Sequence, residues 1–316
     1  MLDTDKHTAL TRARMPRALE VYSDRYTHIA RTPKVIGFVD PTRLTFPNCP
    51  KVAEREASLP AWDKYRMVTD VSMDGWQALI LTPVGTVMAG EGPRRYVGPV
   101  EANTERFHPV AVPAGFVPDH IMHLWNSAVI LSMGDRQMIS GDNEYGRLGL
   151  GHENEMTGFE ELPFRVDRIP SIGLDNTFNY FLSGRQLLFT GQVLPHIAQS
   201  GLLPGYSEYA RCLTATPFRF PKKVRGFYCQ ESTHVWVTDG HTHFCNYDKQ
   251  YAGPFEVTVF GNQWVSDSDV LSFRNSTGQW FYAKTVSDGV AELVECEVSI
   301  RRTEIIPVDL DPWAEQ

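Results

Sequence analysis

The residues that could do chemistry are gathered most tightly in a histidine–cysteine run late in the chain. His241, His243 and Cys245 alternate with other residues, so on a β-strand all three side chains would leave the same face. His234, in the preceding apolar run, would be a fourth metal ligand, and zinc takes about four such ligands. Patterns this short also arise by chance. We interpret these residues as polar positions of an irregular strand pair, so neither a metal nor another cofactor is predicted.

Three signatures of enzymes can be set aside. The run His152–Met156 begins like a zinc-protease helix, but methionine stands where the second histidine is needed. The chain has no Gly-x-Ser-x-Gly elbow of a serine hydrolase. The glycine-rich run 141–151 does not follow the Gly-x-Gly-x-x-Gly order of a dinucleotide-binding loop. We therefore predict that the protein is not an enzyme and that it has no catalytic or cofactor-binding residues.

Composition and charge narrow the class of partner. The chain has 316 residues, a formal net charge of −8 and 42% hydrophobic residues, as expected for a globular protein with a sizeable core. Binders of nucleic acid carry a basic face or domain, and here the cationic runs, such as Lys222–Arg225, are short. The balance argues against extensive contact with nucleic acid.

Cysteine usage and the termini indicate a compartment. The five cysteines are odd in number and form no Cys-x-x-Cys pair, which predicts free thiols in a reducing compartment. Residues 1–6 lack the apolar core of a signal peptide, and no run approaches the roughly 18 apolar residues of a membrane span. We expect an intracellular protein, cytoplasmic or nuclear, that is neither secreted nor held in a membrane.

The elements that would position any site are short strands in pairs. Each apolar run of three or four residues is followed, across a turn residue, by a second short run, as in β-hairpins. The apolar runs are 78–81, 128–131, 180–182, 234–237 and 270–273, and their partners are 85–90, 137–141, 186–191, 240–245 and 278–282.

These hairpins recur with a period near 50 residues. Gly90, Gly141 and Gly191 end corresponding strands and are 51 and 50 residues apart. A proline-apolar-x-apolar quartet, expected to begin a strand where the missing amide costs no ladder bond, recurs at residues 109, 163, 217, 254 and 307. Repeats of this length that contain only short strands indicate a radial or stacked β architecture.

The fold class predicted is all-β: a β-propeller of six blades, or seven if one has escaped detection. The strand that begins at Pro307 has no hairpin after it, so it is expected to pair with a strand near Arg17–Tyr22 and close the ring, which would remove exposed edges. An N-terminal arm is expected at 1–16, a single propeller domain at 17–310 and a C-terminal tail at 311–316. The repeat units are expected near 17–60, 67–112, 119–166, 168–220, 224–257 and 264–310.

The run 141–151, GDNEYGRLGLG, resembles the repeat signature of the regulator of chromosome condensation family. Blades of that family carry a Gly-Asp-Asn-x-x-Gly-x-Leu-Gly-x-Gly run, and here one well-preserved copy stands among several worn ones. The structural signature is carried by Gly141, Asp142, Asn143, Gly146, Leu148, Gly149, Leu150 and Gly151.

The resemblance implies a β-propeller and two alternative functions. Many members of the family are non-enzymatic interaction modules, and its founding member is a guanine-nucleotide exchange factor for the small GTPase Ran. We predict a protein-binding scaffold, with an exchange factor for a Ran-like GTPase as the alternative. Loops carry function on such scaffolds, and aromatic residues are enriched at interfaces. The predicted contacts with a protein partner are therefore the loop aromatics Trp62, Tyr206 and Tyr209.

Overall fold

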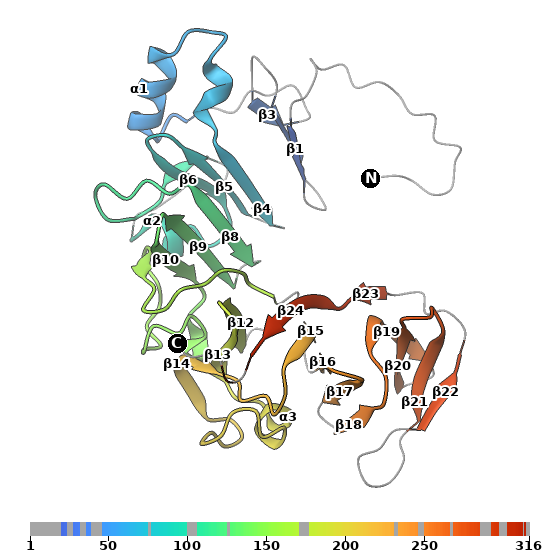
Figure 1. Cartoon of the computed structure of the whole chain (residues 1–316). Helices are drawn as coiled ribbons and strands as arrows, with labels where there is room; N and C mark the ends of the chain where they lie inside the picture. Colours follow the sequence, from blue (N-terminus) through green and yellow to red (C-terminus); the bar gives the residue numbers. More distant parts are fainter. Residues whose placement is uncertain are drawn as a thin grey trace, which may run out of the picture. The chain divides into compact units, whose positions relative to one another are not determined.

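The chain is all-β and consists of several small antiparallel sheets. The computed structural model describes residues 20–23, 28–31, 36–38, 46–74, 77–99, 106–124, 127–170, 177–230, 233–245, 250–265, 268–284, 292–296, 302–311 and 313. The predicted arm at 1–16 and residues 314–316 of the predicted tail lie outside the described residues. The chain divides into two compact units, Met1–Asp142 with Glu155–Leu162, and Asn143–Asn154 with Pro163–Gln316 (Figure 1).

The described residues of the first unit form three sheets in which neighbouring strands are antiparallel. The first has the order β1(Glu20–Ser23)-β2(His28–Arg31)-β3(Ile36–Phe38), the second β4(Asp70–Asp74)-β5(Gln77–Thr82)-β6(Gly85–Gly90)-β7(His108–Pro109), and the third β11(Glu160–Glu161)-β10(Arg136–Gly141)-β9(Ala128–Met133)-β8(His120–Leu124). Its short helices are α1(Pro50–Ser58), η1(Lys64–Met67) and α2(Arg94–Val97).

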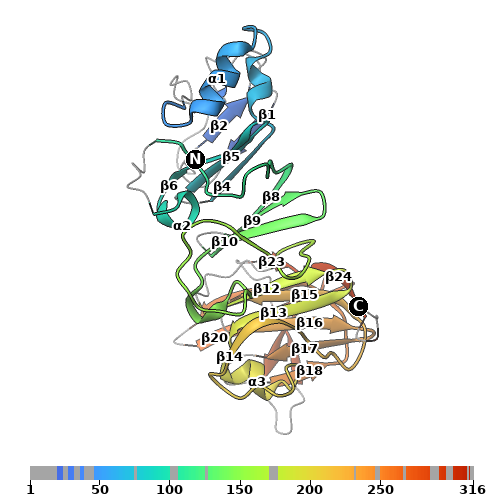
Figure 2. The ribbon, with the colours of Figure 1, turned by 90° about the vertical axis from the view of Figure 1, so that its left-hand side faces the viewer.

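Three sheets also occur in the part of the second unit that the structure describes. They are β12(Phe178–Ser183)-β13(Gln186–Gln192)-β14(Arg211–Pro217), then β18(Gln250–Gly253)-β17(His241–Cys245)-β16(Thr233–Thr238)-β15(Val224–Gln230)-β24(Ile306–Leu310), and β22(Glu292–Glu295)-β21(Trp280–Lys284)-β20(Ser268–Asn275)-β19(Val257–Val265)-β23(Arg302–Glu304). Its helical turns are η2(Glu144–Gly146) and α3(Pro195–Gln199), and α3 lies between β14 and β18 in both views (Figures 1 and 2).

The inner strands are largely apolar because side chains cover both of their faces. In β5, Leu79 and Leu81 pack into one core with Val129 of β9, whereas Ile80 points the other way and packs with Val87. The side chains of Leu79, Ile80 and Leu81 are fully buried. Successive residues of a strand point to opposite faces, so a run covered on both sides has no solvent-facing position, and apolar residues predominate in it. The predicted hairpins therefore appear as β5–β6, β9–β10, β12–β13, β16–β17 and β20–β21.

The predicted period is present in the strand register. Gly90, Gly141 and Gly191 each lie opposite the first residue of the paired inner strand. At Gly141 (φ +146°) a Cβ would collide with the backbone carbonyl of Ser127, and at Gly191 (φ +107°) with that of Thr177. A residue with a side chain would be strained there by its φ as well. Two copies of one close approach, 50 residues apart, show that the repeat is structural.

The expectation that the proline quartets begin strands is wrong for four of the five quartets, whereas Pro307 is the second residue of β24. Pro109 and Pro217 end β7 and β14, and Pro163 and Pro254 come after β11 and β18. Proline has no amide hydrogen to donate to a ladder, and a strand can lose that donor at its end as well as at its beginning. Immediately after Pro109, the Val110 amide donates to the Thr86 carbonyl of β6 at 3.0 Å.

The predicted pairing of the chain's last strand with a strand near Arg17–Tyr22 is also wrong. Instead, β24 pairs with β15, with Leu310 opposite Val224, and β1 pairs with β2. Leu310 and Val224 are both buried in the core that lines β12–β15. This apolar contact accounts for the choice of partner.

Candidate protein-binding surface

Asn143 organises the loop that opens the second unit. Its amide nitrogen donates to the carbonyl oxygens of His152 at 2.9 Å and Asn154 at 3.2 Å, and its side-chain oxygen accepts from the Leu148 amide at 3.2 Å. The side chain is buried, where an unmade hydrogen bond is costly. One side chain therefore ties both ends of the loop 143–154 together.

The loop is anchored to β14. Leu150 forms a β-bridge with Thr214, and the Gly151 amide donates to the Leu213 carbonyl at 2.8 Å. Gly146 has φ +72°, and a Cβ there would collide with the Leu213 side chain. Gly149 closes the turn by donating to the Gly146 carbonyl at 3.0 Å. The spacing of the glycines therefore follows from how closely the loop approaches the strand.

The first two signature residues belong to the first unit. Gly141 ends β10, and the Asp142 amide donates to the Ser127 carbonyl at 3.1 Å. The Asp142 carboxylate lies 3.5 Å from the guanidinium of Arg95. The chain passes from one unit to the other between Asp142 and Asn143, so the signature spans this passage.

A buried arginine holds the loop to the strands below it. The Arg147 side chain is 1% exposed. Its carbonyl accepts hydrogen bonds from the Asn179 amide at 2.9 Å and from the Thr190 hydroxyl. Residues of β12 and β13 thereby fix the backbone immediately after Tyr145 and Gly146.

Two tyrosines in this unit adopt left-handed backbone angles. Tyr145 has φ 62° and Tyr209 has φ 61°, and among the described residues no other residue with a side chain has a positive φ. This conformation costs a residue with a Cβ roughly 1–2 kcal/mol. Such strain persists only where the surroundings impose it, and it gathers at functional sites.

Arg211 contacts Tyr145 and follows Tyr209 closely in the chain. Its guanidinium carbon lies 5.8 Å from the ring centroid of Tyr145, within the range of a cation–π contact, and only Ala210 separates it from Tyr209. Arg211 also forms an ion pair with Glu153. The hydrogen bond and the charge of Glu153 raise the pKa of Arg211, with smaller contributions from Tyr145 and Glu144.

The segment that carries Tyr209 is fixed to the end of β13. The Tyr209 amide donates to the Val193 carbonyl at 2.7 Å, and the Val193 amide donates to the Ala210 carbonyl at 2.8 Å. Beside it, the Glu208 carboxylate accepts from the Gln199 amide at 3.0 Å. The Tyr209 side chain is nevertheless 61% exposed. We call Tyr145 and Arg211 with the nearby Glu144 and Glu153, together with the segment Glu208–Tyr209 that precedes Arg211 in the chain, the tyrosine surface.

The three predicted partner contacts differ in exposure. Tyr209 lies on the tyrosine surface. Tyr206 is half-buried, packs against the core and lies with its hydroxyl 3.3 Å from that of Thr216, so it supports the loop more than it meets solvent. Trp62 belongs to the first unit and is 72% exposed.

Tyr145 and Arg211 could not be identified from the sequence. Tyr145 occupies a variable position of the signature, and Arg211 is 66 residues further along the chain. Their contact depends on the bridge between the loop and β14. A tyrosine at an unspecified position followed by a turn glycine is the only local signal.

The histidine–cysteine run forms no metal site among the residues that the structure describes. The Cys245 thiol donates to the His196 carbonyl at 3.2 Å, and burial raises the pKa of this thiol to about 11. His243 stacks on Trp236, with ring centroids 5.1 Å apart. The alternation of the strand is as predicted, but its side chains serve the core and its edge.

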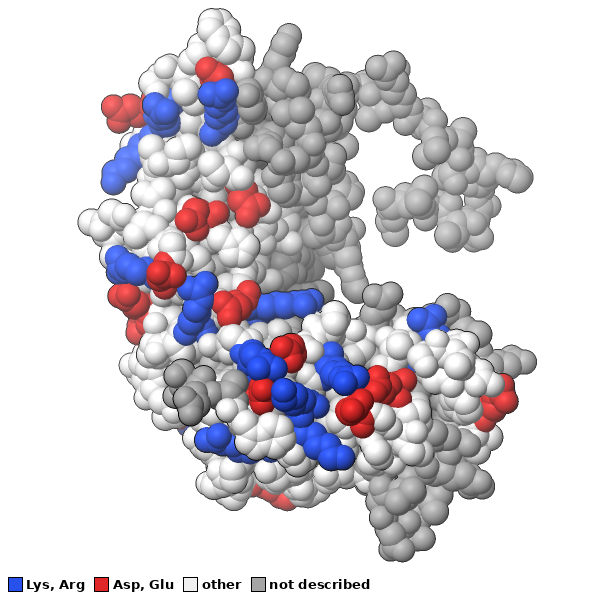
Figure 3. Space-filling model, in the orientation of Figure 1, with Lys and Arg blue, Asp and Glu red and all other residues white. Residues whose placement is uncertain are grey.

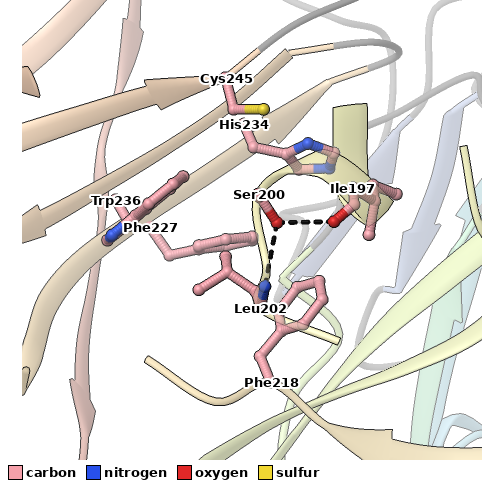
Figure 4. Close-up of a pocket in the computed structure, with 8 residues that line it drawn as sticks. All are labelled: Ile197, Ser200, Leu202, Phe218, Phe227, His234, Trp236 and Cys245. Carbon is pink, nitrogen blue, oxygen red and sulfur yellow. Dashed lines mark hydrogen bonds between the residues drawn. The ribbon is translucent and has the colours of Figure 1, made fainter. Parts of the chain in front are cut away.

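A buried histidine pair lies beneath this run. The rings of His196 and His234 stack with centroids 4.8 Å apart, and the Tyr180 hydroxyl contacts the His234 ring. Burial lowers the pKa of His196 to about 4, and burial together with His196 lowers the pKa of His234 well below its ordinary value. In Figure 4, His234 and Cys245 line one side of a small apolar pocket and Phe218 lines the other. Both rings are neutral near pH 7 and serve packing.

Charges of both signs are interspersed on the described face of the second unit shown in Figure 3. Arg185 pairs with Asp309 at 2.9 Å, and Lys223 pairs with Asp311 at 3.3 Å. Arg225 lies 3.3 Å from Asp239. Two of the three cations in the run Lys222–Arg225 thus have carboxylate partners, as expected of a solvated surface. Separately, none of the helices in the described ranges is long and apolar enough to cross a membrane.

Known proteins resemble this chain in fold. No family model and no curated protein matches the sequence. Human WBSCR16 is 12% identical, with a TM-score of 0.46 over 90% of this chain and 81% of its own. Prp20p from Saccharomyces cerevisiae, described with its binding properties to Gsp1p and histones, is 13% identical, with a TM-score of 0.49 over 93% and 69%.

A further solved structure is Kap60 bound to yeast RCC1 (Prp20), with 16% identity and a TM-score of 0.43. The match covers 77% of this chain and 54% of that one. The identities of these three structures are 16% or less and their TM-scores are below 0.5.

Proposed function

We propose that the chain is a β-propeller of the regulator of chromosome condensation type that acts as a non-enzymatic protein-binding scaffold, and that a protein partner binds its tyrosine surface. The six sheets would be the blades of one ring. The register copies at Gly90, Gly141 and Gly191 support this proposal, as does the signature at the passage between the two units.

The observation that carries the binding proposal is the pair of strained tyrosines beside Arg211. Tyrosine and arginine are enriched among the residues that dominate binding energy at interfaces. A tyrosine has few side-chain torsions to fix, and here the backbone is already fixed by the bonds of Asn143 and Val193. A preorganised surface loses less entropy when a partner binds. Both residues with this strain, at φ 62° and 61°, have side chains that reach solvent, since Tyr145 is half-buried and Tyr209 is exposed.

Affinity purification of the tagged full chain with quantitative mass spectrometry tests this proposal. Three forms are compared: the natural chain, the Tyr145→Ala/Tyr209→Gly variant, and Trp313→Ala. Trp313 is an exposed aromatic residue (67%) of the second unit outside the tyrosine surface. We expect a partner that is retained by Trp313→Ala and lost with the double variant. Equal recovery of every co-purifying protein with all three forms would exclude the tyrosine surface as the binding site.

A nucleotide-release assay separates the scaffold from the alternative, an exchange factor for a Ran-like GTPase. The GTPase is loaded with a fluorescent guanine nucleotide and mixed with the chain at catalytic amounts. The scaffold proposal predicts release at the intrinsic rate of the GTPase. Acceleration that scales with the amount of chain would establish the exchange factor instead.

A further inference from the structure

We propose that the partner segment that meets the tyrosine surface is cationic, a stretch of chain with arginine or lysine side chains. This inference rests on the proposed function and names the chemistry of the partner. It follows from the charges around the two tyrosines and from the way in which the surface already holds one cation of its own.

The charges of the tyrosine surface are predominantly negative. Glu144 and Glu208 are exposed and Glu153 is half-buried, against the single exposed cation of Arg211. A partner with the opposite charge is attracted during its approach, and one with like charge is repelled. Phosphates or an acidic peptide would meet three carboxylates and only one guanidinium, which Glu153 already binds.

Arg211 shows how this surface holds a cation. Its guanidinium lies over the Tyr145 ring and pairs with the Glu153 carboxylate. An aromatic face attracts a cation through its quadrupole, and the carboxylate adds a charge-assisted hydrogen bond. The two groups together form a place for a guanidinium or an ammonium group.

Tyr209 and Glu208, adjacent in the chain, add a second exposed aromatic side chain and a second exposed carboxylate. The Tyr209 ring is exposed, and the contact recorded for the Glu208 carboxylate is with the neutral amide of Gln199. Among the ion pairs of the described residues, none involves Glu208. An exposed aromatic ring and an exposed carboxylate without an ion pair among the described residues are groups that a cationic side chain of a partner can contact.

Fluorescence anisotropy with two labelled model peptides tests the inference. One alternates arginine with serine over ten residues, and the other alternates glutamate with serine. The full chain, Tyr209→Gly, the double variant Glu144→Gln/Glu208→Gln, and two controls, Trp313→Ala and Glu295→Gln, are titrated at low and at physiological salt. Glu295 is an exposed carboxylate of β22, outside the tyrosine surface.

We expect the arginine peptide to bind and the glutamate peptide not to bind. Tyr209→Gly should weaken binding about fivefold, the loss of one exposed cation–π contact. The double glutamine variant should weaken it about fivefold as well, and salt should weaken it further. Binding by the two controls should match that of the natural chain.

Failure of this inference differs from failure of the proposed function. If the arginine peptide does not bind, or binds every variant equally, the cationic partner is wrong. If the glutamate peptide binds instead, the charge argument is reversed. In either case the purification experiment can still show a partner that depends on Tyr209, and the scaffold would stand with a different partner chemistry.

Discussion

The guanidinium carbon of Arg211 lies 5.8 Å from the ring centroid of Tyr145, across a contact that joins the loop 143–154 to β14. The two residues are 66 positions apart in the sequence. The signature residues determine the conformation of this loop, and the loop presents the Tyr145 side chain at the surface. The same run of residues therefore has a structural role and also contributes an aromatic ring to the tyrosine surface.

The strain at Tyr209 predicts an unusual order of stabilities. Glycine accepts φ 61° freely, whereas alanine keeps the strain. Tyr209→Gly should therefore be more stable than Tyr209→Ala by about 1 kcal/mol, although glycine is the more mobile residue when unfolded. Urea denaturation of both variants measures the difference. A glycine variant less stable than the alanine variant would mean that the backbone at residue 209 is not left-handed.

The three hydrogen bonds between the Asn143 side chain and the backbone of its loop predict a large loss of stability when this side chain is removed. Asn143→Ala leaves the Leu148 amide and two carbonyls of the loop without their partner. We expect the free energy of unfolding to fall by about 2–4 kcal/mol, measured by urea denaturation. Asn154→Ala is the matched control. Asn154 is exposed and bonds Asn143 through its backbone carbonyl, which the substitution to alanine keeps. If the free energy of unfolding changes by less than about 0.5 kcal/mol in both variants, the Asn143 side chain does not hold the loop.

The close approach at Gly141 predicts that alanine is poorly tolerated there. A Cβ would meet the Ser127 carbonyl and lie 2.9 Å from the Ala128 Cα. Together with the strain of φ +146°, we expect Gly141→Ala to cost about 3 kcal/mol or more. Gly134 has φ +59°, and a Cβ added there would meet no other atom within 4 Å, so Gly134→Ala should cost about 1 kcal/mol. Thermal unfolding of the two variants measures these two costs. Equal costs would contradict the register of β9 and β10.

The buried histidine pair predicts a loss of stability in mild acid. A histidine whose pKa is lower in the folded than in the unfolded state binds more protons when unfolded, so the free energy of unfolding falls as the pH drops. For His196 this window runs from about pH 6.5 down to about pH 4, and between pH 7 and 5 the loss is about 2 kcal/mol. His234 acts in the same direction. The other titratable side chains in contact with the pair are the Tyr180 hydroxyl, at the His234 ring, and the Cys245 thiol, at the His196 carbonyl.

Urea denaturation at pH 7 and pH 5 measures this loss, with His196→Phe as the comparison. Phenylalanine keeps an aromatic ring against His234 and removes one titrating group. The variant should lose about 2 kcal/mol less between the two pH values than the natural chain. The same loss in both proteins would contradict a buried neutral His196.

The hairpins and their period could be predicted because local sequence determines them. Inner strands such as β5 and β9 are covered on both faces, so their apolar runs stand out. The outer strands could not be found in the same way. In β8, His120 is exposed and Ile121 buried, and no simple alternation marks so short a strand against a loop.

Pairings between distant segments were beyond the sequence. The choice of β15 as the partner of β24 depends on the core around Leu310 and Val224. The tyrosine surface depends likewise on the bridge from Leu150 to Thr214. Of the three aromatic residues expected to contact a partner, exposure distinguishes Tyr209 from Tyr206, and exposure follows from packing that the residue types alone do not specify.

The central claim is tested most directly with the protein that the affinity purification recovers. Isothermal titration calorimetry measures its dissociation constant for the natural chain and for Tyr209→Gly. The substitution removes the exposed ring and is expected to leave the fold intact. We predict that binding weakens about tenfold or more, as for a residue that dominates an interface, while Trp313→Ala binds as the natural chain does. A dissociation constant unchanged by Tyr209→Gly would contradict the claim that the tyrosine surface binds the partner.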